Sequence, residues 1–169
     1  MPAHRAGARL NAVPEGELGR WRGRGLVGRM WHDPWRMDSS RLSALPILAD
    51  LSAAELDQLA EVLGEVEVEA GAELIRRDAY GTAVYFIEQG EAEVRMTDGG
   101  TEKLGPGDMC GEIALLLTGQ RTATVVARTP TRVFQLTGLD FERIRGQVPQ
   151  LERLLRHVGA ERVRPTYQR

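Results

Sequence analysis

Polar and apolar residues alternate strictly over residues 65–69, and this period of two predicts a strand with one buried face. Further short segments with strand character lie at residues 73–76, 83–88, 91–96, 101–104, 123–127 and 131–136. Turns rich in glycine separate them, including the run Gly105-Pro106-Gly107-Asp108. Short strands at such close spacing predict a mainly β domain, either a sandwich or a jelly roll.

Helical patterns flank the predicted strands on both sides. Ser52 and Glu55 form a capping-box pattern before apolar residues at helical spacing, namely Leu56, Leu59, Val62 and Leu63. After the last strand, Thr137 and Asp140 form another capping pattern. A final helix should follow Pro149, with Leu151, Leu154, Leu155 and Val158 on one face. We therefore expect one helix before the strands and two after them.

The chain divides into a leader, one domain and a short tail. Residues 1–41 are rich in Gly, Arg and Pro, contain all three tryptophans and show no sustained period, which predicts a poorly ordered leader. A weak membrane-surface or partner contact through Trp and Arg stays open there, as does a true start at Met37. Residues 42–158 form the predicted domain, and residues 159–169 form the C-terminal tail.

Composition agrees with one soluble domain. The 169 residues suffice for one ordinary domain with tails, and the net charge of −2 gives no overall attraction to nucleic acid or membranes. The single cysteine, Cys110, excludes an internal disulfide framework. No apolar run approaches the roughly 20 residues of a membrane-spanning helix, and no secretory signal opens the chain. A cytoplasmic protein is expected.

Residues 111–124 interrupt the strands and carry the candidate chemistry. A helical turn can begin after Gly111, because the residues from Glu112 to Leu116 are mostly good helix formers. The start of such a turn presents free amides and a positive dipole end, which suit a phosphate. Arg121 on the returning strand would neutralise that phosphate, whereas the Glu112 carboxylate suits a neighbouring hydroxyl. A ribose phosphate offers both groups.

These residues resemble the phosphate-binding cassette of the cyclic-nucleotide-binding domain family. In that family a Gly-Glu pair is followed, nine residues after the glutamate, by an arginine and two small residues, and Glu112 and Arg121 keep this spacing. The resemblance extends over most of residues 42–158. It implies a double-stranded β-helix, or jelly-roll barrel, with an N-terminal helix and C-terminal helices. An aromatic residue often precedes the Gly-Glu pair in the family, where this chain has Cys110.

The resemblance also implies a role for each cassette residue. Glu112 would accept a hydrogen bond from the ribose 2′-hydroxyl, and Arg121 would bind the cyclic phosphate. The backbone from Gly111 through Ile113 and Ala114 would contact the phosphate oxygens. Thr122 and Ala123 would line the same pocket. The expected ligand is cyclic AMP, with cyclic GMP left open, and neither a cofactor nor a metal is expected.

Several rival interpretations can be compared with this one. Cupin metalloenzymes need several histidines inside the barrel, but His4, His32 and His157 lie outside the predicted strands. Hydrolase and nucleotide-phosphate motifs such as Gly-x-Ser-x-Gly and the Walker loop are absent from the sequence, so no catalytic residue and no enzyme is expected. A ligand-free scaffold, in which Glu112 and Arg121 form only an ion pair, stays open.

The remaining alternatives concern what the module controls. A transcription regulator of the catabolite-activator type would have the same ligand domain, but only 32 residues run from Gly138 to Arg169, too few for a dimer helix plus a DNA-binding module. A truncated piece of such a regulator stays open, and nucleic-acid binding by this chain alone is not expected. An Arg-Arg-x-Ser inhibitor sequence is absent, which disfavours a kinase regulatory subunit.

The leucine face of the last helix raises the question of partners. Such a face packs either on the barrel or on a second chain, so a homodimer through the C-terminal helix stays open beside an unknown effector protein. The resemblance implies that the same helix supplies the residue that covers the base, with Leu154, Leu155, His157 and Val158 as candidates. We expect a stand-alone regulatory module that changes the position of its C-terminal helices when it binds a cyclic nucleotide.

Overall fold

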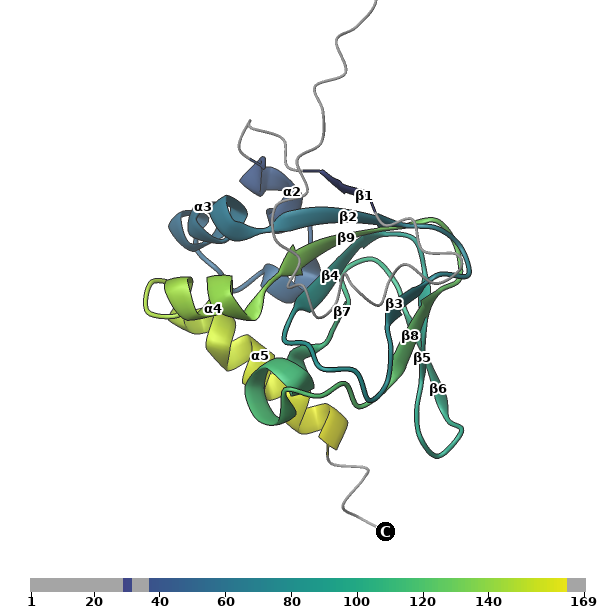
Figure 1. The fold of residues 1–169 in the computed structure, drawn as a ribbon. Coiled ribbons are helices and arrows are strands. Elements are labelled where there is room, and N and C mark those ends of the chain that lie inside the picture. The colour runs from purple at the N-terminus through teal and green to yellow at the C-terminus, as the bar shows by residue number, and fades with distance from the viewer. Residues whose placement is uncertain (1–28, 32–36, 164–169) are drawn as a thin grey trace, which may run out of the picture.

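The computed structural model describes residues 29–31 and 37–163, which form a β-barrel with helices packed on one side (Figure 1). The helical elements are α2 (Ser39–Ser43), η1 (Pro46–Leu48), α3 (Ala53–Val62), η2 (Ala114–Thr118), α4 (Gly138–Ile144) and α5 (Pro149–Val163). The strands are β1 (Arg29–Trp31), β2 (Gly64–Val68), β3 (Glu73–Ile75), β4 (Val84–Gln89), β5 (Ala92–Arg95), β6 (Thr101–Leu104), β7 (Met109–Cys110), β8 (Thr124–Ala127) and β9 (Thr131–Leu136).

Within the described part of the chain, the strands form two antiparallel sheets. One has the order β1-β2-β9-β4-β7 and the other has the order β3-β8-β5-β6. The centre of the first sheet joins strands that are far apart in sequence, since Phe86 of β4 lies opposite Phe134 of β9. Non-sequential pairing of this kind is the topology of a jelly roll, so the predicted mainly β barrel with flanking helices is confirmed.

Strand β4, inside the first sheet, is buried on both faces. Val84 and Phe86 of β4 pack with the helices in one hydrophobic cluster. The intervening Tyr85 and Ile87 point into the barrel, where they join a second cluster with residues such as Val133 of β9. Because successive side chains of a strand point to opposite faces, the continuous apolar run of β4 serves both clusters. The stretch that carries the candidate site follows β7, which pairs with this doubly buried strand.

The helices begin where the capping patterns predicted. The Ser52 hydroxyl accepts a hydrogen bond from the Glu55 amide while the Glu55 carboxylate accepts one from the Ser52 amide, which completes the capping box of α3. The Thr137 hydroxyl caps α4 in the same way by accepting from the Asp140 amide. In Figure 1 α3, α4 and α5 lie together on the left of the barrel, opposite the β5–β6 hairpin.

Several short elements escaped the sequence patterns. Helix α2, η1 and the two-residue strand β7 are too short to show a period. Leu42 of α2 is fully buried, so ordered structure begins ahead of the capping box at Ser52. At the other end α5 continues past Val158 to Val163, into the stretch that the sequence patterns assigned to a tail. Most of the predicted poorly ordered leader, with Trp21 and Trp35, lies outside the described residues.

Candidate functional site

Residues 111–123, here called the cassette, leave the first sheet at β7 and return to the second sheet at β8. The chain turns sharply at Gly111, whose φ of +96° is one that side-chain-bearing residues rarely adopt. A Cβ at this position would lie 2.5 Å from the Ala83 carbonyl oxygen and 2.8 Å from Nη1 of Arg121. Glycine therefore allows β7, β4 and the Arg121 guanidinium to approach one another closely.

Arg121 is buried at the return of the cassette, with only 4% of its surface exposed. Its Nη1 donates to the carbonyl oxygen of Ala83 at 2.9 Å and to that of Gly111 at 3.3 Å. The guanidinium also lies over the ring of Tyr85, 5.8 Å from the centroid. A cation over an aromatic face gains electrostatic attraction, so Tyr85 of β4 orients Arg121 together with Ala83, which directly precedes that strand.

Glu112 is more deeply buried still, at 1% exposure. Both of its carboxylate oxygens accept from Nη1 of Arg162, at 2.8 and 2.9 Å. Nη2 of the same guanidinium donates to the carbonyl oxygen of Met109 at 2.8 Å. Arg162 lies on the last turn of α5, so the end of this helix is tied both to the first acidic residue of the cassette and to β7.

The other predicted site residues line the same segment with different exposure. Ala114 is buried at the start of η2, Ile113 and Ala123 are half-buried, and Thr122 is exposed beside the buried Arg121. The predicted helical turn after Gly111 is present, and it ends at Gly119, whose amide donates to the Ala114 carbonyl. The fold thus brings Gly111 and Arg121 into contact, and Glu112 directly follows Gly111 in the chain.

Sequence reasoning missed Arg162. The helical period held the necessary information, because Arg162 follows Leu151, Leu155 and Val158 at steps of three or four residues and so belongs to the face that points toward the barrel. Leu151 and Leu155 are fully buried, and Leu154 and Val158 pack beside them against the helical cluster. His157 points outward and pairs with Glu161 of its own helix. Of these α5 residues, Arg162 is the one that hydrogen-bonds to the cassette.

Cys110 lies next to the cassette and is buried, which raises the pKa of its thiol to about 12 because the charged thiolate would lose its hydration. Among the described residues, no group of three or more His, Cys, Asp or Glu side chains is arranged to hold a metal ion. No helix within residues 37–163 has the length and apolar character that a membrane span requires.

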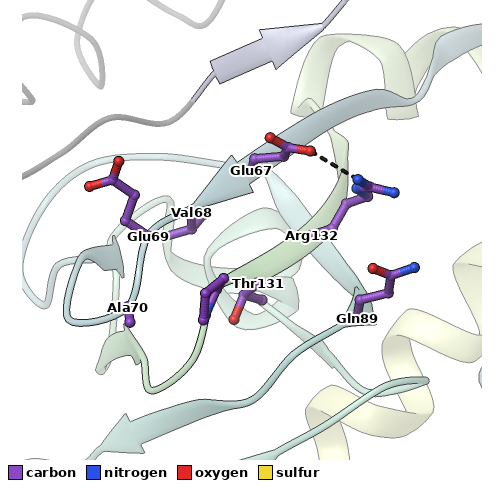
Figure 2. A pocket seen from close by; sticks show the side chains of 8 residues that line it. Glu67, Val68, Glu69, Ala70, Gln89, Thr131 and Arg132 are labelled. Atoms are coloured by element: carbon purple, nitrogen blue, oxygen red, sulfur yellow. Dashed lines mark hydrogen bonds and ion pairs between the residues drawn. The ribbon is translucent and has the colours of Figure 1, made fainter.

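A separate pocket of about 440 Å³ lies where β2 ends and β9 begins (Figure 2). Its walls include Gln89, Thr131 and an ion pair in which Nη2 of Arg132 lies 3.0 Å from Oε1 of Glu67. None of its lining residues belongs to the cassette. The buried Thr131 hydroxyl already donates to the carbonyl oxygens of Glu91 and Thr129. The other polar side chains that line the pocket are exposed or half-buried, so the cassette remains the candidate site.

Comparison with known proteins shows which family shares this sequence and fold. Residues 65–147 match the family model of the cyclic nucleotide-binding domain. The cAMP-dependent protein kinase regulatory subunit of Neurospora crassa is 34% identical over 132 residues, which cover 77% of this chain and 34% of that protein. The chain spans about a third of the length of the curated relatives that it matches.

Solved structures agree with the sequence relatives. The regulatory domain of Toxoplasma gondii PKA, co-crystallised with cAMP, superimposes with a TM-score of 0.60 at 29% identity and covers 67% of this chain and 46% of that one. The catabolite activator protein of Thermus thermophilus gives a TM-score of 0.63 at 25% identity over 72% of this chain and 59% of that one. Since the family model, the curated relatives and the solved structures agree, the chain belongs to the cyclic nucleotide-binding domain family.

Proposed function

We propose that this chain binds cyclic AMP in the cassette and acts as a regulatory module. The observation that carries the proposal is a pair of oppositely charged side chains, Glu112 and Arg121, both almost fully buried in one segment of a cyclic-nucleotide-binding domain. Relatives with this domain include kinase regulatory subunits named for cAMP, and a similar solved domain was co-crystallised with cAMP. Cyclic GMP remains the second ligand to test.

The chemistry of the cassette suits a cyclic ribose phosphate. Arg121 supplies a fixed cation for the phosphate, and charge-assisted hydrogen bonds of this type are among the strongest in proteins. The amides from Gly111 to Ala114 lie at the first turn of a helix, where N–H groups have no partner within the helix and can bind phosphate oxygens. Glu112 has lone pairs for a ribose hydroxyl, and Thr122 and Ala123 would line the same pocket.

Burial of charge favours a ligand over an inert scaffold. Removal of two ionised groups from water costs several kcal/mol per ion, and replacement of such charges by apolar residues is often neutral or stabilising. A barrel without a ligand would therefore gain little from keeping a carboxylate and a guanidinium in its cassette. A bound nucleotide would pair its phosphate with Arg121 and its ribose hydroxyl with Glu112.

The same contacts connect binding to the C-terminal helices. Arg162 of α5 donates a hydrogen bond to Glu112, so a change at the cassette alters the contact that anchors the end of α5. A ligand shifts such an equilibrium only as far as its affinities for the two helix positions differ. We infer that the module signals through the position of α5, as a stand-alone protein with a separate effector. A truncated piece of a catabolite-activator-type regulator is the second candidate, because the Thermus thermophilus protein shares the fold.

Thermal melting with cyclic AMP and cyclic GMP, each titrated separately, tests the proposal. A ligand that binds only the folded state adds about 2.7 kcal/mol at roughly 100 times its dissociation constant. For a domain of this size the midpoint should rise by about 5–10 °C. If neither nucleotide moves the midpoint at millimolar concentration, the chain is a ligand-free scaffold and the proposal is wrong.

A pair of arginine variants locates the site. Arg121→Ala should weaken cyclic AMP binding by at least about tenfold, because one charge-assisted hydrogen bond contributes about 1.5–3 kcal/mol. Arg128→Ala is the matched control, since Arg128 is exposed on the barrel and lies outside the cassette. Calorimetric titration, at a temperature where circular dichroism shows both variants folded, gives the two affinities. Equal affinities would place the phosphate elsewhere.

A further inference from the structure

Gln135 of β9 and Tyr85 of β4 form a polar contact inside the barrel. The two residues lie opposite each other in the first sheet, and Tyr85 in turn lies opposite Cys110, which directly precedes the cassette. Residues directly opposite on paired strands point to the same face, so these side chains form one row, and Tyr85 and Cys110 belong to the cluster that fills the barrel. Nε2 of Gln135 donates to the Tyr85 hydroxyl at 3.3 Å, and both residues are only 3% exposed.

The Tyr85 ring connects this contact to Arg121. Gln135 holds the hydroxyl at one end of the ring, and the face of the ring lies under the guanidinium, with 5.8 Å between its centroid and Cζ of Arg121. The attraction of a cation to an aromatic face depends on where the ring lies. The carbonyl oxygens of Ala83 and Gly111 both accept from a single nitrogen, Nη1. The ring therefore adds a restraint on the plane of the guanidinium.

We propose that Gln135 is a positioning residue for phosphate binding: it fixes the Tyr85 ring, and the ring fixes the plane of the Arg121 guanidinium. The proposal rests on the proposed function and deepens it, since it names the side chains that orient the cation before the nucleotide binds. A guanidinium binds a phosphate most strongly through two parallel hydrogen bonds, which require a set orientation. Preorganisation of this kind raises affinity, because less conformational freedom is lost on binding.

Stability alone does not account for a glutamine at position 135. Its Oε1 is buried and accepts no hydrogen bond from the residues that the structure describes. A buried acceptor without a partner lowers stability, so an apolar side chain of similar size would suit the barrel at least as well. Gly64, which lies opposite Gln135 on its other side, has no side chain that could supply a donor. The contribution that remains is the hydrogen bond from Nε2 to Tyr85.

Gln135→Leu separates positioning from packing. The variant should bind cyclic AMP about threefold to tenfold more weakly, the change that corresponds to one neutral hydrogen bond. Its thermal midpoint should stay equal or rise, because the unpaired Oε1 is gone. In a chain that also carries Arg121→Ala, the same substitution should leave the affinity unchanged, since no guanidinium is left to position.

A second cycle keeps Arg121 in place. Tyr85→Phe retains the ring but removes the hydroxyl, so it should reproduce the loss of affinity, and the double variant of Tyr85→Phe with Gln135→Leu should lose no more than either substitution alone. Thr131→Val is the matched control on β9, because Thr131 is buried and its hydroxyl donates to the Glu91 carbonyl, away from the cassette. Its affinity should equal that of the parent. Calorimetric titration of cyclic AMP into each full-length chain gives the affinities.

The two cycles decide between the outcomes. A loss in Gln135→Leu that disappears without Arg121, or that is not increased by Tyr85→Phe, supports the positioning role. An equal loss with and without Arg121, or losses that multiply in the double variant, would show that Gln135 acts independently of this route, and the role is refuted. Unchanged affinity in both single variants also refutes it, while the effect of Arg121→Ala still supports the proposed function. If neither the parent nor any variant binds, the proposed function fails and the positioning role fails with it.

Discussion

Gly111→Ala is the substitution for which the structure gives the clearest expected cost. The φ of +96° would strain an alanine by about 2 kcal/mol, within the range for residues held outside the common backbone regions. The new Cβ would also lie 2.5 Å from the Ala83 carbonyl oxygen, which is backbone and cannot move aside like a flexible side chain. Overpacking of this kind costs about 2 kcal/mol more. The free energy of unfolding should therefore fall by about 4 kcal/mol in total.

Gly99→Ala provides the control that separates the two contributions. Gly99 has a similar φ of +84°, but no atom lies within 4 Å of the position that a Cβ would take there. Its alanine variant should lose only the strain, about 2 kcal/mol. Thermal melts followed by circular dichroism should show midpoints lowered by about 12 °C for Gly111→Ala and about 6 °C for Gly99→Ala. If the two variants melt together, the close approach at Gly111 contributes nothing and our account of the cassette turn is refuted.

Three further predictions concern other parts of the fold. Burial raises the pKa of the Cys110 thiol from 9.0 to about 12, so above about pH 9 the thiol ionises in the unfolded chain but not in the folded one, and the folded state loses stability. The urea midpoint of the parent chain should therefore be lower above that pH than below it, and the difference should be smaller for Cys110→Ala. The guanidinium of Arg41 pairs with the carboxylates of both Glu65 and Glu88, so Arg41→Ala leaves both without this partner and should lower the free energy of unfolding in urea by about 3 kcal/mol. Arg41→Lys should recover only part of this loss, and a full recovery would show that charge alone matters there. Ser52→Ala removes the hydroxyl half of the α3 capping box and should cost about 1 kcal/mol, and an unchanged melting midpoint would contradict that role.

Much of the candidate site could be found without the fold. The glycine, the carboxylate and the arginine of the cassette are recognisable because each performs a task that few residue types can perform: a positive φ, hydrogen-bond acceptance and fixed positive charge. Their spacing along one continuous segment made Glu112 and Arg121 visible together. Arg162 lies 50 residues from Glu112 and has no local motif, so only its place on the α5 face connected it to the site.

The sequence by itself determined the elements whose causes are local. Alternation produced β2, capping side chains set the first residues of α3 and α4, and the helical period placed Leu151 and Leu155 on the buried face of α5. These features follow from steric and hydrogen-bonding preferences of neighbouring residues, which act before any long-range contact forms.

Only the tertiary structure decided which distant segments meet. The pairing of β4 with β9, the burial of β4 on both faces and the closure of Arg162 over Glu112 all depend on how the sheets fold over each other. Hydrophobic burial is non-directional, so an apolar run such as residues 84–87 predicts that these residues are buried but does not predict which segment they pack against. The partner is chosen by the packing of the whole barrel, and so is the charge that covers the cassette.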